Sequence, residues 1–169
     1  MANTQSLCTS FLGELLTGTH NFGAAPIRAA ATADTFRAAL YLTTATVNAT
    51  KATYGGTVGS VADSGEVTGT NYTAGGVIVT NATAPLSTNS SPTAGTAYWT
   101  PSAAIQYGSV GVPVTLATSF DAVLIFNNTQ GNKAVSVHTF GAQTVTAGIF
   151  SLTMPTNSTT TALVRIATV

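Results

Sequence analysis

From residue 35 onward, short β-prone runs alternate with turn-forming residues, and this alternation constrains the fold more than any other feature of the chain. The runs recur about every ten residues, a spacing that is typical of antiparallel sandwiches and barrels. Glycine, proline, asparagine and serine separate them. The expected strands lie at residues 36–42, 77–79, 98–100, 104–107, 120–126, 133–140, 144–154 and 162–167.

Two of these runs predict a β-hairpin. Residues 120–126 are almost continuously apolar, as in a central strand. Residues 133–140 alternate, with Val135 and Val137 on one side and Ser136 and His138 on the other. The polar segment 127–132 between the two runs is the expected turn.

The N-terminal segment has a different pattern. Its apolar residues between positions 4 and 16 recur at helical spacing, with Thr4 as the expected N-cap and Gly18 at the C-terminus. Residues 19–34 are expected to form an extended arm or loop, with a helix at the alanine run 29–31 as the alternative. The apolar stripe of the helix must pack on its own sandwich or on a neighbouring molecule. Because the arm is a long tether, we favour the neighbour.

These patterns predict an all-β fold, an antiparallel β-sandwich of jelly-roll type with an N-terminal helix and extended arm. The predicted division is residues 1–34 for the helix and arm and residues 35–169 for the sandwich. Residues 81–96 are rich in asparagine, threonine and serine, and are expected to form an exposed loop.

Charged residues are scarce. They make up 6% of the chain, against about 25% in an average soluble domain. Threonine, alanine, glycine, serine and asparagine take their place, which gives a polar surface with little charge repulsion between molecules. Such a surface suits a protein that packs against neighbours.

The charge and hydropathy patterns also argue against several functional classes of protein. The net charge is zero and no basic stripe is present, so we expect no nucleic-acid binding. No run of about 18 apolar residues predicts a membrane span, and the first residues lack the basic region of a signal peptide. Cys8 is the only cysteine, so an intrachain disulfide is impossible. Synthesis in a reducing cytoplasm is expected.

The residues that could carry catalysis are dispersed. His20 follows the predicted helix and His138 lies within a strand, and each is expected to be hydrogen-bonded or exposed rather than a metal ligand or base. Cys8 lies on the apolar stripe of the helix and is expected to be a buried structural thiol.

The carboxylates favour structural roles as well. Asp34 precedes a strand, and Asp63 and Glu66 bracket a turn. Asp121 opens a strand, where it would bond backbone amides or meet Arg165. An acid–base pair among these four is the less favoured alternative. We therefore expect no enzyme activity, no metal and no cofactor.

Two further segments have a structural and a functional interpretation. The glycine-rich stretch 65–76 has no lysine and lies between strands, so a structured turn is favoured over a phosphate-binding loop. Tyr72, Tyr98 and Trp99 could line a sugar-binding face, but packing in the core or in an interface is favoured.

Several stretches carry a resemblance to a known group of proteins. They are LCTSF (7–11) with ELL (14–16), TFRAALY (35–41), GEVTGTNYTAGG (65–76) and FDAVLIF (120–126), with VHTFG (137–141) through TMPTN (153–157) in the C-terminal part. Over most of its length the chain resembles small virion proteins encoded among the head and tail genes of tailed bacteriophages. In size and composition only, it also resembles the jelly-roll cement proteins that decorate phage heads. No motif in the resemblance is catalytic.

The resemblance implies a structural role at the surface of a phage capsid. The expectation is a cement or decoration protein that bridges capsomers, with the major capsid protein and further copies of itself (a homo-dimer or homo-trimer) as partners. A neck or tail component is the structural alternative, and a carbohydrate-binding receptor module is the alternative of another class. The candidate interface residues are Leu7, Phe11, Leu15, Tyr72, Tyr98 and Trp99.

Overall fold

The computed structural model describes residues 2–22, 33–80, 85–88 and 95–167, and it is mostly β with one short helix. Helix and strands follow the expected order, with additional short strands at the N-terminus and before residue 96. The elements are β1 (Ser6–Leu7), α1 (Thr9–Leu16), β2 (Phe36–Leu42), β3 (Val77–Ile78), β4 (Leu86–Ser87), β5 (Thr96–Trp99), β6 (Ile105–Tyr107), β7 (Val114–Asn127), β8 (Lys133–Gly148), β9 (Phe150–Leu152) and β10 (Val164–Ala167).

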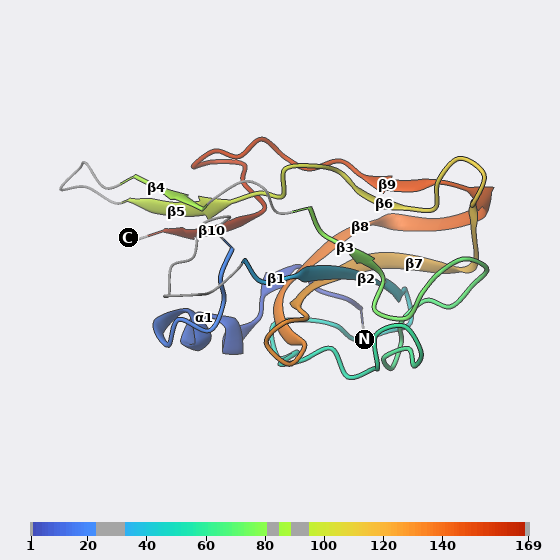
Figure 1. Cartoon of the computed structure of the whole chain (residues 1–169), viewed down its shortest axis with the longest axis horizontal. Helices are drawn as coiled ribbons and strands as arrows, with labels where there is room; N and C mark the ends of the chain where they lie inside the picture. Colours follow the sequence, from blue (N-terminus) through green and yellow to red (C-terminus); the bar gives the residue numbers. More distant parts are fainter. Residues whose placement is uncertain (1, 23–32, 81–84, 89–94, 168–169) are drawn as a thin grey trace.

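The strands form a sandwich of unequal layers (Figure 1). A five-stranded antiparallel sheet has the order β1-β8-β7-β2-β3. The facing layer consists of two smaller antiparallel sheets, β10-β5-β4 and β6-β9. The predicted all-β class with an N-terminal helix is confirmed. The jelly-roll arrangement is not confirmed, because that fold divides eight strands between two sheets.

The five-stranded sheet is covered on both faces. On one side, the hydroxyl of Tyr107 in β6 donates to the Ala38 carbonyl in β2 over 3.0 Å, and Trp99 of β5 lies 6.0 Å from Phe36 between ring centroids. On the other side lie the loops of residues 43–76 (Figure 1), where the Tyr54 ring stacks on Phe126 at 4.6 Å. This double coverage explains why the strand at 120–126 is almost continuously apolar.

The predicted hairpin is confirmed, but its second strand is longer than expected. β7 and β8 pair through a turn in which Gly131 and Asn132 both have positive φ. β8 continues through Gly148, so residues 144–148 belong to the hairpin and only Phe150–Leu152 forms the next strand. Ser136 is fully buried, like its neighbours on the opposite side, because the sheet has no solvent face at this position.

The helix begins later than predicted. It starts at Thr9 with Cys8 as its N-cap residue, so the prediction of Thr4 as the cap was wrong. The reason is tertiary, because β1 occupies the preceding residues and pairs with β8. Gly18 ends the helix as predicted, with a φ of 65°. The Gly18 N–H donates to the Leu15 carbonyl, and the Thr19 N–H donates to the Glu14 carbonyl. This pair of hydrogen bonds is the Schellman arrangement.

Helix α1 packs on its own chain, which corrects the expectation of packing on a neighbour. Its Phe11 is 1% exposed and belongs to the common core, together with Cys8. Asn3 anchors the segment that precedes the helix. Its side-chain amide nitrogen donates to the Leu42 carbonyl at 3.1 Å and to Asp121 at 2.6 Å.

The expected arm is described only in part. Residues 20–22 are buried, with Phe22 inside the core, so this portion does not extend away from the sandwich. The alanine run 29–31 and the larger part of the predicted loop 81–96 lie outside the described residues.

Candidate functional site

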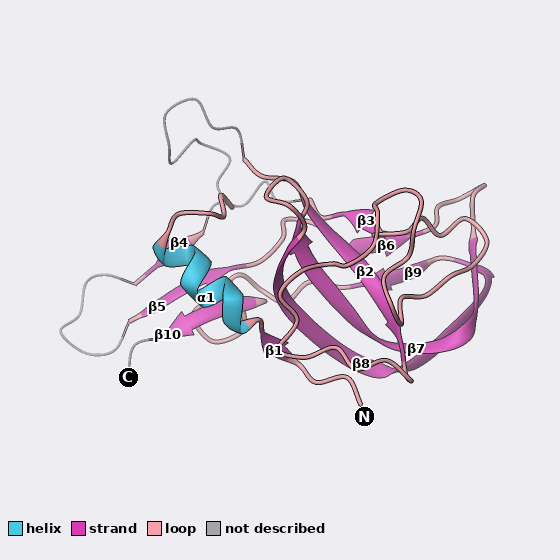
Figure 2. Cartoon of the chain, turned by 90° about the horizontal axis from the view of Figure 1, so that it is seen from below, coloured by secondary structure: helices cyan, strands magenta, loops and turns pink. Residues whose placement is uncertain are grey.

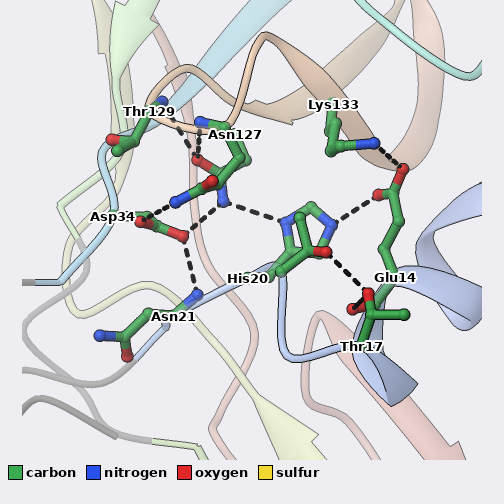
Figure 3. Close-up of polar contacts among 10 residues, drawn as sticks. Glu14, Thr17, His20, Asn21, Asp34, Asn127, Thr129 and Lys133 are labelled. Atoms are coloured by element: carbon green, nitrogen blue, oxygen red, sulfur yellow. Dashed lines mark hydrogen bonds and ion pairs between the residues drawn. The ribbon is translucent and has the colours of Figure 1, made fainter. Parts of the chain in front are cut away.

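Two buried polar networks contain most of the histidine and carboxylate candidates. The first is centred on His20, whose side chain is fully buried. Its Nε2 lies 2.7 Å from one carboxylate oxygen of Glu14, and the other oxygen of Glu14 lies 2.6 Å from Nζ of Lys133. Its Nδ1 lies 3.0 Å from Nδ2 of Asn127 (Figure 3). The network thus joins α1 and residue 20 to β7 and β8.

The surroundings of Asn127 define the protonation state of His20. Nδ2 of Asn127 also donates to Asp34 over 2.7 Å, and its Oδ1 accepts the backbone N–H groups of Thr129 and Gln130. Because the amide orientation is fixed in this way, Nδ1 of His20 must accept and its Nε2–H must donate to Glu14. Burial lowers the pKa of His20 and outweighs the attraction of Glu14, which favours this neutral tautomer.

Glu14 is ionised in the same network. Burial alone would raise the pKa of its carboxyl group, but the hydrogen bonds from Lys133 and His20 outweigh this effect and the pKa is lowered. Asp34 accepts the backbone N–H of Asn21 at 2.8 Å (Figure 3). It also accepts the side-chain amide of Gln130 at 3.0 Å. Both nitrogens of His20 therefore serve to connect segments of the fold.

The second network is built around Glu66, in the glycine-rich stretch. One carboxylate oxygen accepts the Tyr54 hydroxyl and the Asp63 N–H, both at 2.8 Å. The other accepts the Tyr72 hydroxyl at 2.9 Å and the Gly75 N–H at 2.7 Å. Four donors thus satisfy a carboxylate that is 4% exposed. The stretch forms a structured turn, as predicted.

Asp63 extends this second network. Its carboxylate lies 2.6 Å from Nζ of Lys51 and accepts the Tyr41 hydroxyl at 2.5 Å. Burial acts to raise the pKa of Asp63, but these partners outweigh it and the pKa is lowered. Burial and the adjacent Glu66 raise the pKa of both Tyr54 and Tyr72. The lowered pKa of Asp63 favours its ionised form and the raised pKa values keep the phenols of Tyr54 and Tyr72 neutral, a distribution that suits a structural role.

The remaining candidates also have structural surroundings. Cys8 is fully buried, as predicted, and burial raises its pKa to about 11, so the thiol is not activated. Nε2 of His138 lies 2.9 Å from Oγ of Ser136, and burial lowers the pKa of His138 to about 4. Asp121 accepts from Asn3 instead of meeting Arg165, whose guanidinium donates to the Thr159 carbonyl.

The structure brings four of the six interface candidates together. Phe11, Leu15, Tyr98 and Trp99 line a cavity of ≈ 310 Å³ between α1 and the sheet β10-β5-β4. We call this cavity the apolar wedge. Figure 2 shows α1 lying across the strands of that small sheet. The other lining residues are Gly18, His20, Phe22, Pro85, Ala97, Val164 and Ile166.

The six candidates differ in exposure. Phe11 and Trp99 are buried in the core, where the Trp99 ring lies 4.7 Å from the Phe22 ring. Leu7, Leu15, Tyr72 and Tyr98 are partly buried. Because Trp99 is covered and the Tyr72 hydroxyl is held by Glu66, these two rings do not form an exposed flat face with Tyr98.

Sequence reasoning missed one central residue, Glu14. Its partners His20 and Lys133 come from two different parts of the chain, and the only local signal was a carboxylate in the last turns of a helix, where the dipole disfavours it. A charge at an unfavourable position indicates that a tertiary partner exists.

Comparison with known proteins gives no relative: no protein-family model, no curated protein and no solved structure matches this chain. In the part of the chain that the structure describes, no three histidine, cysteine or acidic side chains gather as a metal site. None of the described helices has the length and apolarity needed to cross a membrane.

Proposed function

We propose that this protein is a structural component of a tailed-phage particle, and that it acts as a cement or decoration protein on the capsid surface. One observation carries the proposal. Every charged side chain that the structure describes makes a hydrogen bond or ion pair within the chain itself. The scarce charges are engaged within the fold, so few of them are free to contact a partner.

An exterior of this kind favours assembly. Two such surfaces approach without charge repulsion and without losing the hydration of ionised groups, which is costly when charges are buried. Attachment across capsomer boundaries stabilises the assembled shell, because a ligand that binds only the assembled state shifts the equilibrium away from disassembly. The partners are the major capsid protein and further copies of the same chain. The resemblance described above supports this setting.

The alternatives predict different locations or ligands. A neck or tail component would use the same uncharged surface at fewer places on the particle. A carbohydrate-binding module would need exposed aromatic faces, and the burial of Trp99 favours assembly over that role. A glycan-binding screen on the purified protein tests this alternative directly.

The proposal is tested on purified particles of a phage that encodes the chain. Quantitative mass spectrometry measures its copy number relative to the major capsid protein. A comparable copy number supports cement, and a few copies per particle would point to the neck or tail. Absence of the protein from particles that are otherwise complete would overturn a structural role.

The mode of attachment gives a second test. Ion pairs weaken as the Debye length falls from about 10 Å at 0.1 M salt to about 3 Å at 1 M. Because few charges are free to enter an interface, we expect the protein to stay on pelleted particles between low and molar NaCl and to be released by urea. Progressive release by NaCl alone would show that charges on the partner hold it, and the uncharged-contact mechanism would be wrong.

A further inference from the structure

A second cavity, of ≈ 370 Å³, is lined by polar groups from three segments of the chain. Its lining comes from residues 5–7, residues 137–138 of β8, and positions 155, 161–163 and 165 in the C-terminal part. We call this cavity the arginine groove. Because Ser6 of β1 pairs with Val137 of β8, backbone hydrogen bonds hold two of the three segments together. The groove is therefore a built feature of the sandwich.

Arg165 supplies the charge of this groove. Val164 and Ile166 line the apolar wedge, whereas Arg165 between them lies on the other face of β10 and lines the groove. None of the described residues that line the groove is acidic. The ring of His138 is neutral at pH 7, since burial lowers its pKa to about 4. Arg165 is thus the single charged group among the described lining residues.

The guanidinium group of Arg165 is weakly held by its own chain. A guanidinium has five N–H donors, and in the described part of the chain Nη1 donates to the Thr159 carbonyl over a long distance of 3.3 Å. The carboxylate expected to meet it, Asp121, accepts from Asn3 instead. Most of the hydrogen-bond capacity of Arg165 is therefore left for a ligand.

The rest of the lining combines polar groups with apolar surface. Gln5 is exposed, and its side-chain amide can both donate and accept. The Ser6 hydroxyl donates to the Thr4 carbonyl, so its oxygen can still accept from a ligand hydroxyl. Leu7 and Leu163 are partly buried and offer apolar contact to the carbon skeleton of a ligand. Such a mixture is typical of sites for small polar molecules.

We propose that the arginine groove binds a small organic acid, whose carboxylate pairs with Arg165 and whose neighbouring hydroxyl groups contact Gln5 and Ser6. A carboxylate accepts two parallel N–H groups of a guanidinium, which gives both strength and orientation. An amine is a poor ligand, because no described lining residue offers a carboxylate to its ammonium group. A free hydroxy acid and an acidic sugar both have the required chemistry.

The size of the groove favours such a ligand over a bare inorganic anion. A cavity of ≈ 370 Å³ has room for a molecule as large as a monosaccharide. Phosphate would meet Arg165 but would leave most of this volume, and the polar groups of Gln5 and Ser6, without contacts. This inference does not rest on the structural role proposed above.

The test is isothermal titration calorimetry on the purified full-length protein. The probes are malate for a free hydroxy acid and glucuronate for an acidic sugar, with glucose and inorganic phosphate as comparisons. We expect one site for at least one of the two acids and no binding of glucose. Arg165→Gln should weaken the binding about tenfold or more, because it removes the charge-assisted hydrogen bonds. Arg165→Lys, which keeps the charge but loses the fork, should have an intermediate affinity.

Two further variants separate a local from a general effect of charge. Gln5→Glu keeps the size of an exposed side chain but places a negative charge in the groove, so it should also weaken binding about tenfold. Val110→Glu is the matched control. It changes the net charge equally, but Val110 is 95% exposed in the turn between β6 and β7, away from β1 and β10 (Figure 1). It should leave the affinity unchanged, and all four variants should keep the unfolding midpoint of the wild type.

Several results would overturn the assignment. They are the absence of binding for both acids, an affinity that Arg165→Gln or Gln5→Glu leaves unchanged, or equal weakening by Val110→Glu. Phosphate binding as tightly as the two acids would mean an adventitious anion only. A preference for malate or for glucuronate supports the site and identifies the source of the carboxylate. The measurement needs no phage particle, so its failure is distinguishable from failure of the proposed structural role.

Discussion

Acidification from pH 7 to pH 5 should destabilise this protein, and His138 should be a main cause. The fold lowers the pKa of His138 from 6.5 to about 4 by burying the ring. The folded chain therefore keeps this side chain neutral at pH 5, whereas the unfolded chain protonates it. Unfolding then takes up a proton, so stability is complete above pH 6.5 and is lost as the pH falls toward 4.

The expected loss follows from the two pKa values. At pH 5, protonation of His138 stabilises the unfolded state by a factor of about thirty, whereas the folded state binds almost no proton at this side chain. The free energy of unfolding is therefore about 2 kcal/mol lower at pH 5 than at pH 7. This is a large share of the 5–15 kcal/mol that is typical of a folded domain. Burial also lowers the pKa of His20, which adds to the loss in the wild-type chain. The lowered pKa values of Glu14 and Asp63 matter only at more acid pH, below about 4.5.

Urea unfolding measures this effect, with the single tryptophan as the probe, because Trp99 is 2% exposed in the folded chain. The matched variant is His138→Gln, which can keep a hydrogen bond to Ser136 but does not titrate. We expect its free energy of unfolding to fall about 2 kcal/mol less than that of the wild type between pH 7 and pH 5. An equal decrease in both proteins would refute the assignment of the effect to His138.

Four further outcomes are expected. Phe11→Ala should cost about 3–5 kcal/mol in urea unfolding if α1 belongs to the core of its own chain, and a loss below 1 kcal/mol would contradict that packing. Glu66→Gln should cost about 3 kcal/mol, since one carboxylate accepts four hydrogen bonds, and an unchanged unfolding midpoint would argue against the network. Cys8 should resist thiol reagents at pH 8 until the chain is unfolded, and rapid labelling of native protein would show that it is accessible. Nitrogen NMR at pH 7 should find His20 neutral with its proton on Nε2, and the opposite tautomer would reverse the orientation inferred for its partners.

The sequence predicted those elements whose signal is local. The strand at 36–42 and the hairpin around residues 127–132 were found because apolar alternation and turn residues lie within one short segment. The end of the helix at Gly18 was found for the same reason, since a glycine with positive φ is a local requirement.

The elements that were missed depend on distant partners. Residues 6–7 have no strand signal of their own and become β1 only because β8 offers its edge. Because of that pairing, the helix begins at Thr9 and not after the expected cap at Thr4. Likewise, nothing near His20 in the sequence indicates Asn127, and the partner of Asp121 proved to be Asn3. Short polar residues far apart in sequence have no pattern from which such contacts could be predicted.

The pairing of β1 with β8 has a consequence for how the chain reaches this structure during synthesis. Ser6 emerges from the ribosome early, whereas its partner Val137 is made near the end. Until then the apolar face of α1 and the early strand β2 lack the β7–β8 hairpin that covers them. Long-range pairing of this kind slows folding and leaves apolar surface open to aggregation. We therefore expect the sandwich to close only after translation is nearly complete, so that N-terminal fragments ending before β7 accumulate as insoluble protein.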